Sequence, residues 1–211
     1  MIRIVLATTL AGIGLLTFAC ANPAANKPKA SVGNAAPESS PAAGPGEKLN
    51  ISPANSKIDF VAAKVTRSHN GSFKQFTGTI NLVNSSAEQS QVTIEIEANS
   101  VVTDEPDLTK HLQTPDFFDV AKFPKASFVS TKIEPITSGG THNITGNFEL
   151  HGIKKAITFP ATIQVTPDNV TVNAEFAINR KDWGLTYPGK ADDLIRDGVV
   201  IKLNVTAQRK K

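Results

Sequence analysis

Apolar and polar residues alternate with a period of two along most of the chain after residue 48. In the clearest stretch, 170–178, Val, Ala, Phe and Ile positions alternate with Thr, Asn, Glu and Ala positions, and 92–98 and 199–207 show the same pattern. Successive side chains of a strand point to opposite faces, so this period predicts half-buried strands. Weaker alternation predicts five further strands, at 58–65, 73–83, 126–136, 142–150 and 153–165.

The links between these eight strands are short, which favours antiparallel hairpins, because a parallel crossover needs a dozen residues or more. Eight antiparallel strands with one apolar face each must pack as a sandwich or close into a barrel. The other face carries Thr, Glu, Lys and Asn, so we expect an all-β fold, a soluble eight-stranded antiparallel barrel. The links carry turn-forming residues at Asn70–Gly71, 84–86, 138–140, His151–Gly152 and 167–169.

Two segments between the strands have a different pattern. In 103–112, Pro106 suits the first position of a helix, and Leu108 and Leu112 share one face of it, so a short helix is expected near the barrel mouth. Residues 180–197 are irregular and predict a long loop before the last strand.

The N-terminus has the pattern of an export signal. Residues 4–18 form an apolar stretch that is too short for a bilayer core, which needs about 20 residues. Small Ala19 and then Cys20 follow, and this resembles a bacterial lipoprotein signal, in which the cysteine is lipidated. The alternative is a free thiol after an ordinary signal peptidase cut. Ala21 favours sorting to an outer membrane, if the organism has one.

Residues 21–48 are rich in Pro, Ala, Gly and Ser. A segment of this composition buries no core, so we expect a disordered linker between a signal peptide at 1–20 and a folded domain at 49–208.

The composition narrows the classes of function. The formal net charge of +3 is small for 211 residues and disfavours a nucleic-acid role, and a single Cys excludes an intrachain disulfide. The chain has eleven Phe but only one Trp and one Tyr. Its aromatic residues therefore supply large apolar side chains with few polar groups. No metal-ligand spacing, nucleophile elbow or phosphate-binding loop occurs, so no metal, no catalytic residue and no cofactor are predicted.

Four ordered segments resemble the YceI-like polyisoprenoid-binding family. Residues 111–131 are similar to its HL…DFFD…P…A…F signature, and the other three are Phe73–Gly78, 146–160 and 176–184. The resemblance implies a lipocalin-like barrel around an apolar pore that holds a long-chain amphiphile, such as a polyisoprenoid, a quinone-like tail or a fatty amide.

Candidate ligand-binding residues follow from this pore. Phe117 and Phe118, beside the expected helix, are expected to cap the mouth, and Leu112 and Trp183 are further ligand-binding candidates. Arg180 is expected to bind a polar head group, because guanidinium bonds phosphate or carbonyl oxygen well. Its alternative role is an ion pair with Asp182 or Asp116 that fixes the long loop. The Phe residues expected to face inward, either as ligand wall or as packed core, are Phe60, Phe128, Phe148, Phe159 and Phe176.

The sequence therefore predicts a non-enzymatic, periplasmic, membrane-anchored lipoprotein that binds, sequesters or transports a lipid. An interaction module for stress response or structure, with a barrel filled by side chains, is the second hypothesis. An enzyme that uses His111 or Arg180 is the third. Whether the barrel forms a homodimer stays open.

Overall fold

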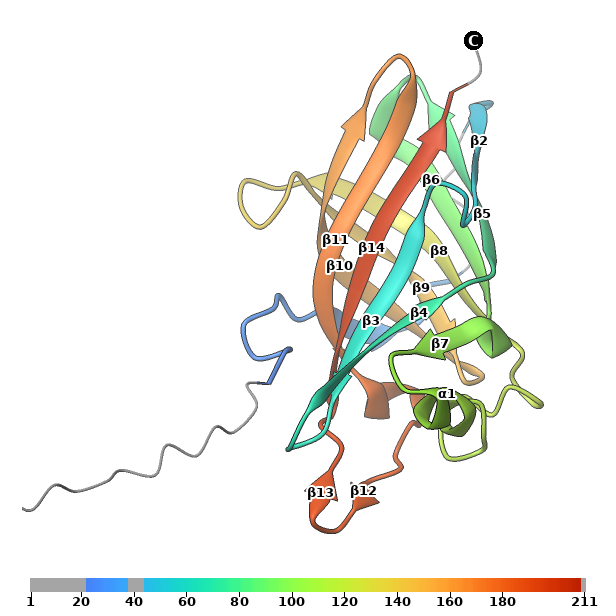
Figure 1. Cartoon of the computed structure of the whole chain (residues 1–211). Helices are drawn as coiled ribbons and strands as arrows, with labels where there is room; N and C mark the ends of the chain where they lie inside the picture. Colours follow the sequence, from blue (N-terminus) through green and yellow to red (C-terminus); the bar gives the residue numbers. More distant parts are fainter. Residues whose placement is uncertain (1–21, 38–43, 210–211) are drawn as a thin grey trace, which may run out of the picture.

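The computed structural model describes residues 22–37 and 44–209, so the expected signal peptide and Cys20 lie outside the described residues. The fold is all-β with one short α-helix, as the alternation predicts (Figure 1). The described elements are β1 Ser31–Asn34, β2 Glu47–Ile51, β3 Lys57–Ala63, β4 Ser68–Phe73, β5 Phe76–Val83, β6 Ser86–Glu97, η1 Ala98–Ser100, β7 Val101–Thr103, α1 Pro106–Leu112, β8 Lys125–Pro135, β9 His142–Leu150, β10 Ile153–Val165, β11 Asn169–Asn179, η2 Arg180–Trp183, β12 Gly189–Lys190, β13 Asp193–Leu194 and β14 Gly198–Gln208.

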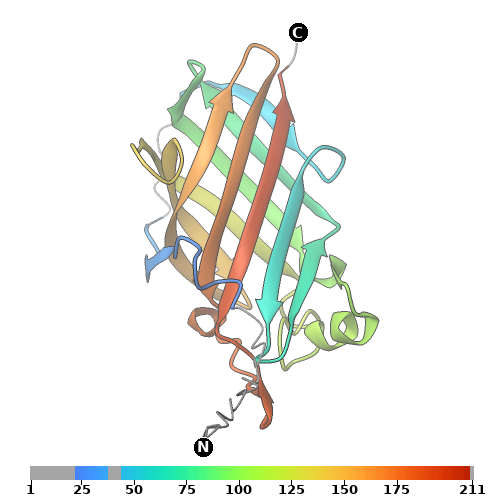
Figure 2. The same cartoon turned by 60° about the vertical axis from the view of Figure 1, so that its left-hand side comes forward.

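A single antiparallel sheet curls strongly around an apolar interior (Figures 1 and 2). The strand order is β2-β5-β6-β8-β9-β10-β11-β14-β3-β4-β7, and β1 pairs with β10 off this path. The curl brings the β2 edge round to β14, where Arg209 Nε lies 2.9 Å from the Glu47 carboxylate and the Ser56 hydroxyl accepts from the Thr206 N–H at 3.0 Å.

The expected count of eight strands is not confirmed, because this sheet has 12 strands in the described residues. The stretch 73–83, expected as one strand, contains the end of β4 and all of β5. Asn70–Gly71, expected as a turn, lies inside β4. Gly is required there by a close approach, since the Phe60 ring of β3 lies directly over residue 71.

Residues 22–37 correct the expectation of a disordered linker. β11 pairs with β10 only at 162–165, so part of β10 lacks a partner on that side. β1 fills this gap and pairs with Lys155–Thr158, while Ala30 N–H donates to the Ala177 carbonyl of β11 at 2.9 Å. All four β1 residues are exposed. The segment is therefore ordered by the unpaired backbone groups of β10 and β11, which composition does not reveal.

The expected helix is confirmed as α1. Pro106 occupies its first turn, where the missing N–H costs no hydrogen bond. Leu112 is buried, and Leu108 packs on the same cluster with Phe60, Val101 and Phe117. The long loop 180–197 contains η2 and the β12–β13 hairpin, and both figures place this hairpin and α1 at one end of the molecule (Figures 1 and 2). We call this end the α1 end.

The opposite end carries the β10–β11 turn and the described C-terminus (Figure 1). The predicted hairpin between β9 and β10 is confirmed, with Gly152 at a φ of 72° and His151 at 52°. Among the described residues, no helix is long and apolar enough to cross a membrane.

We expect Gly71→Ala to lower the free energy of unfolding by about 1–3 kcal/mol, because a Cβ at this position overlaps the Phe60 ring and forces it to move. Thermal or urea unfolding followed by circular dichroism measures this change. The matched control is Gly33→Ala in β1, where a Cβ meets nothing within 4 Å. Equal stability of the two variants would contradict the close packing of Phe60 on β4.

Candidate ligand-binding site

The interior of the curled sheet contains an apolar cavity. Eight strands contribute to its wall: β3, β4, β6, β8, β9, β10, β11 and β14. Their inward positions supply only aliphatic and Phe side chains, because alternate residues of each strand face the same side. The lining residues are Ile58, Phe73, Val92, Ile94, Ile96, Phe128, Ile144, Phe148, Ile157, Phe159, Val172, Phe176, Ile178, Ile201, Leu203 and Val205.

The cavity has a volume of about 100 Å³. On this scale one water molecule needs about 10–15 Å³, so the space equals about seven to ten waters. Water in such a space would find no polar partner on the lining side chains, and apolar cavities of this kind stay dry and bind apolar molecules. The arrangement therefore suits a hydrocarbon segment and offers no group for acid–base or nucleophilic chemistry.

The two ends of the cavity differ. Toward the β10–β11 turn the interior is packed, and a space of only about 10 Å³ remains among Ile80, Leu82, Ile163 and Val170. Toward the α1 end, aromatic rings pack against lining residues of the cavity. Phe73 contacts Phe118 with a centroid separation of 5.8 Å. Phe148 contacts Trp183 at 5.2 Å, and the indole N–H donates to the Phe148 carbonyl at 3.3 Å.

Among the Phe residues expected to face inward, Phe128, Phe148, Phe159 and Phe176 line the cavity. Phe159 and Phe176 stack with centroids 4.1 Å apart and make a flat part of its wall. Phe60 is also buried, but it belongs to the separate cluster under α1.

The two expected cap residues, Phe117 and Phe118, and the candidates Leu112 and Trp183 lie at the α1 end, in two groups. Leu112 and Phe117 pack with Phe60 in the α1 cluster. Phe118 and Trp183 contact the cavity wall directly, through the ring pairs described above.

Arg180 lies away from the cavity and holds the long loop. Its guanidinium donates to the backbone carbonyls of Leu185, Ile195 and Arg196. Asp197 is its ion-pair partner, at 3.5 Å. Burial lowers the pKa of Arg180, and the Asp197 charge opposes this shift. These contacts favour the loop-fixing alternative over a head-group role, although the partner is Asp197 rather than Asp182 or Asp116.

An apolar tunnel implies aliphatic lining residues, but the sequence prediction did not name those that line this wall. Ile94, Ile144 and Val172 are among the lining residues beside the Phe side chains. The signal was available in the same alternation, because each lies on the inward face of a predicted strand. Phe73, which the resemblance places in a hairpin motif, also lines the cavity.

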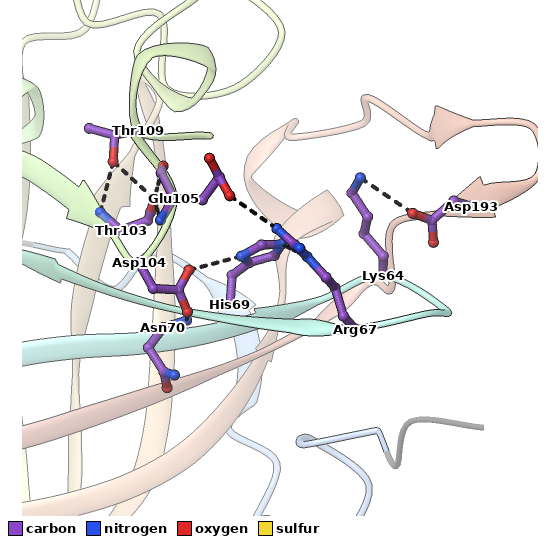
Figure 3. Close-up of polar contacts among 9 residues, drawn as sticks. All are labelled: Lys64, Arg67, His69, Asn70, Thr103, Asp104, Glu105, Thr109 and Asp193. Atoms are coloured by element: carbon purple, nitrogen blue, oxygen red, sulfur yellow. Dashed lines mark hydrogen bonds and ion pairs between the residues drawn. The ribbon is translucent and has the colours of Figure 1, made fainter. Parts of the chain in front are cut away.

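A polar network between β4 and the β7–α1 link is the other candidate site (Figure 3). His69 is 7% exposed, and its Nδ1 lies 2.8 Å from the Asp104 carboxylate. Arg67 Nε donates to His69 Nε2 at 2.9 Å, so Nδ1 carries the proton and donates to Asp104. Both ring nitrogens are therefore engaged, and the network joins β4 to the β7–α1 link.

The second histidine of interest, His111, contacts Asp116 at 2.8 Å and packs edge-on against Phe117 and Tyr187. It is therefore a packed residue of the α1 end. No group of three or more His, Cys, Asp or Glu side chains that could hold a metal ion occurs within 22–37 and 44–209.

Comparison with known proteins assigns the family. The YceI-like domain model matches residues 49–207, which include all the strands that line the cavity. The chain belongs to the YceI-like family. A UPF0312 protein of Pseudomonas putida (strain W619) is 32% identical over 125 residues, 56% of this chain and 65% of the relative. The match thus spans less than two thirds of that relative's length.

Solved structures show the same fold. BcnA of Burkholderia cenocepacia superimposes on this YceI-like chain with a TM-score of 0.67 and 25% identity, over 74% of this chain and 99% of BcnA. A polyisoprenoid-binding domain from Saccharophagus degradans has a TM-score of 0.60 at 15% identity, over 77% of this chain and 99% of its own. The YceI protein of Campylobacter jejuni has a TM-score of 0.55 at 25% identity, over 67% and 85%.

The Asp104 carboxylate gives a pH-dependent prediction. The Asn70 N–H bond and the His69 bond hold the pKa of Asp104 below its ordinary value, against the opposing effect of burial. A lowered carboxyl pKa stabilises the fold above the unfolded-state pKa of about 3.9, and this stability is lost as pH falls through the folded-state pKa. We therefore expect Asp104→Ala to lower the melting temperature at pH 7, and the difference from wild type to shrink below about pH 4.

Thermal unfolding between neutral and acid pH measures this difference. The control is Asp107→Ala, because the Asp107 side chain is 89% exposed and we expect little change at any pH. A difference for Asp104→Ala that is as large at acid pH as at neutral pH would show that the carboxylate charge plays no part.

Proposed function

We propose that this YceI-like protein binds the hydrocarbon tail of a long-chain amphiphile inside its curled sheet and so sequesters or carries that lipid. The observation that carries the proposal is the cavity wall, which eight strands build from apolar side chains alone. The fold relationship to the Saccharophagus degradans polyisoprenoid-binding domain supports the same class of ligand. Polyisoprenoids, quinone-like tails and fatty amides share the chemistry that this wall recognises.

The size of the cavity sets how the tail is held. A methylene group is close to water in size, so about seven to ten carbons fit without rearrangement. A longer tail requires the lining to move outward. Ile and Leu side chains can change rotamer at modest cost, and each further buried methylene contributes about 0.8 kcal/mol. We infer that binding widens the cavity until this gain no longer exceeds the cost of repacking.

The tail enters from the α1 end in this account, because the other end is packed. Phe118 and Trp183 then act as the closing rings of the mouth, and the polar head group stays outside them. Arg180 holds the loop that carries Leu185 and Ile195, so it positions one side of this mouth without contacting the ligand.

The remaining parts of the proposal concern location and partners. An anchor at Cys20 and a periplasmic position would place the cavity beside a membrane, which is both the source and the destination of such a ligand. In this account the protein catalyses no reaction and needs no cofactor. A filled interaction module is not favoured, because the described interior retains the cavity of about 100 Å³.

The binding test uses fatty amides of increasing chain length with the full chain. We expect the melting temperature to rise with tail length, because each added methylene strengthens binding of the amide to the folded protein and so stabilises it. The rise should level off when the cavity can widen no further. Val172→Phe fills part of the cavity, so we expect it to weaken binding of a long amide about tenfold or more.

Isothermal titration and native mass spectrometry measure these affinities. The matched control is Val32→Phe, which places the same ring on the exposed β1 and should leave binding unchanged. Unfolding of each variant without ligand shows whether Val172→Phe still folds. An affinity that changes neither with tail length nor with Val172→Phe would rule out the interior as the ligand site.

A further inference from the structure

Two exposed apolar side chains form a pair at the α1 end. Val65 lies in the β3–β4 turn and is 46% exposed, and Leu194 lies in β13 and is 49% exposed. Val65 N–H donates to the Leu194 carbonyl at 3.1 Å, and Lys64 forms an antiparallel bridge with Ile195. In this register Val65 and Leu194 are directly opposite each other, so their side chains share a face. We call this pair the tip.

The backbone of the tip is held in place by polar contacts (Figure 3). The Asp193 carboxylate accepts from the Thr66 hydroxyl at 2.9 Å and pairs with Lys64 Nζ at 3.3 Å. Arg67 pairs with Glu105 at 3.4 Å, which ties the same turn to the start of α1. Two loops distant in sequence are thus fixed together, with two apolar side chains presented to the outside.

The described chain begins at this same end. Ala24 is buried against Val61 and Val200, and a Cβ at Gly198 would meet the Ala24 methyl at 2.9 Å. Val61 precedes Val65 by four residues, about 13 Å along an extended strand. Residues 1–21, with the apolar stretch 4–18 and Cys20, therefore join the described fold close to the tip.

We propose that the Val65–Leu194 tip is the point at which this end of the protein contacts a lipid bilayer. Two side chains are too few for a stable protein interface, which buries about 800 Å² per partner. They suffice for a bilayer, because an anchor close by keeps the tip at high effective concentration near the membrane. Lys64 and Arg67, the two cations of the β3–β4 turn, are paired with carboxylates, so we expect an apolar contact rather than a response to anionic lipid.

This contact deepens the proposed function, because it turns the closing rings of the mouth toward the membrane, from which a lipid tail would come. It rests on the anchoring part of that proposal and does not depend on the identity of the cargo.

The test places a fluorescent nitrobenzoxadiazole label at Leu194→Cys in the full chain, reconstituted in phosphatidylcholine vesicles. Spin-labelled phosphatidylcholine quenches only labels that reach the lipid. We expect a blue-shifted emission and loss of half or more of the intensity, unchanged by high salt. The control label is Gln89→Cys, an exposed position in β6 beside the β5–β6 turn, which should not be quenched. Wild-type chain gives the background from Cys20.

Adding Val65→Asp to the Leu194→Cys chain should reduce the quenching at least twofold, while the fold remains intact by circular dichroism. A Leu194 label as unquenched as the Gln89 label overturns the proposal, and so does equal quenching of both labels. A blue shift that appears without vesicles and grows with protein concentration overturns it in favour of a second copy. The amide titrations need no vesicles, so failure of the tip and failure of lipid binding are distinguishable.

Discussion

The rest of the structure depends on the burial of one continuous apolar face. Side chains of a strand alternate between two faces, so a sheet with Val, Ile and Phe on one face must cover that face from water. This sheet does so by curling on itself, and the Arg209–Glu47 ion pair joins the β2 edge to the end of β14. Side chains fill the interior near the β10–β11 turn but leave an apolar space in the middle.

The two ends of the curl consequently have different roles. One end is a packed core with short turns, and the other carries α1, η2 and the β12–β13 hairpin. Buried Arg180 donates hydrogen bonds to several carbonyl groups of the long loop. Polar groups inside a protein need such partners. The His69–Asp104 contact ties β4 to the β7–α1 link. These polar contacts thus hold the loops of the α1 end in place.

The sequence predicts what is local. The expected strands 142–150 and 153–165 coincide with β9 and β10, and α1 begins at Pro106, because alternation and helix-start signals act over a few residues. Four of the five inward Phe predictions lie at the cavity for the same reason. Non-local pairing was not predictable. β1 pairs with residues of β10 that lie more than 120 residues later in the chain. The ion-pair partner of Arg180, Asp197, likewise depends on how the long loop folds back.

The central claim is that an apolar tail occupies the space between the eight lining strands. The most direct measurement is a crystal structure of the full chain with a fatty amide that carries bromine at the end of its tail, located by anomalous scattering. The account predicts a bromine peak among Phe128, Ile144 and Val172, with the amide at the α1 end. A peak confined to the outer surface, or no peak at saturating amide while the lining side chains fill the space, would contradict it.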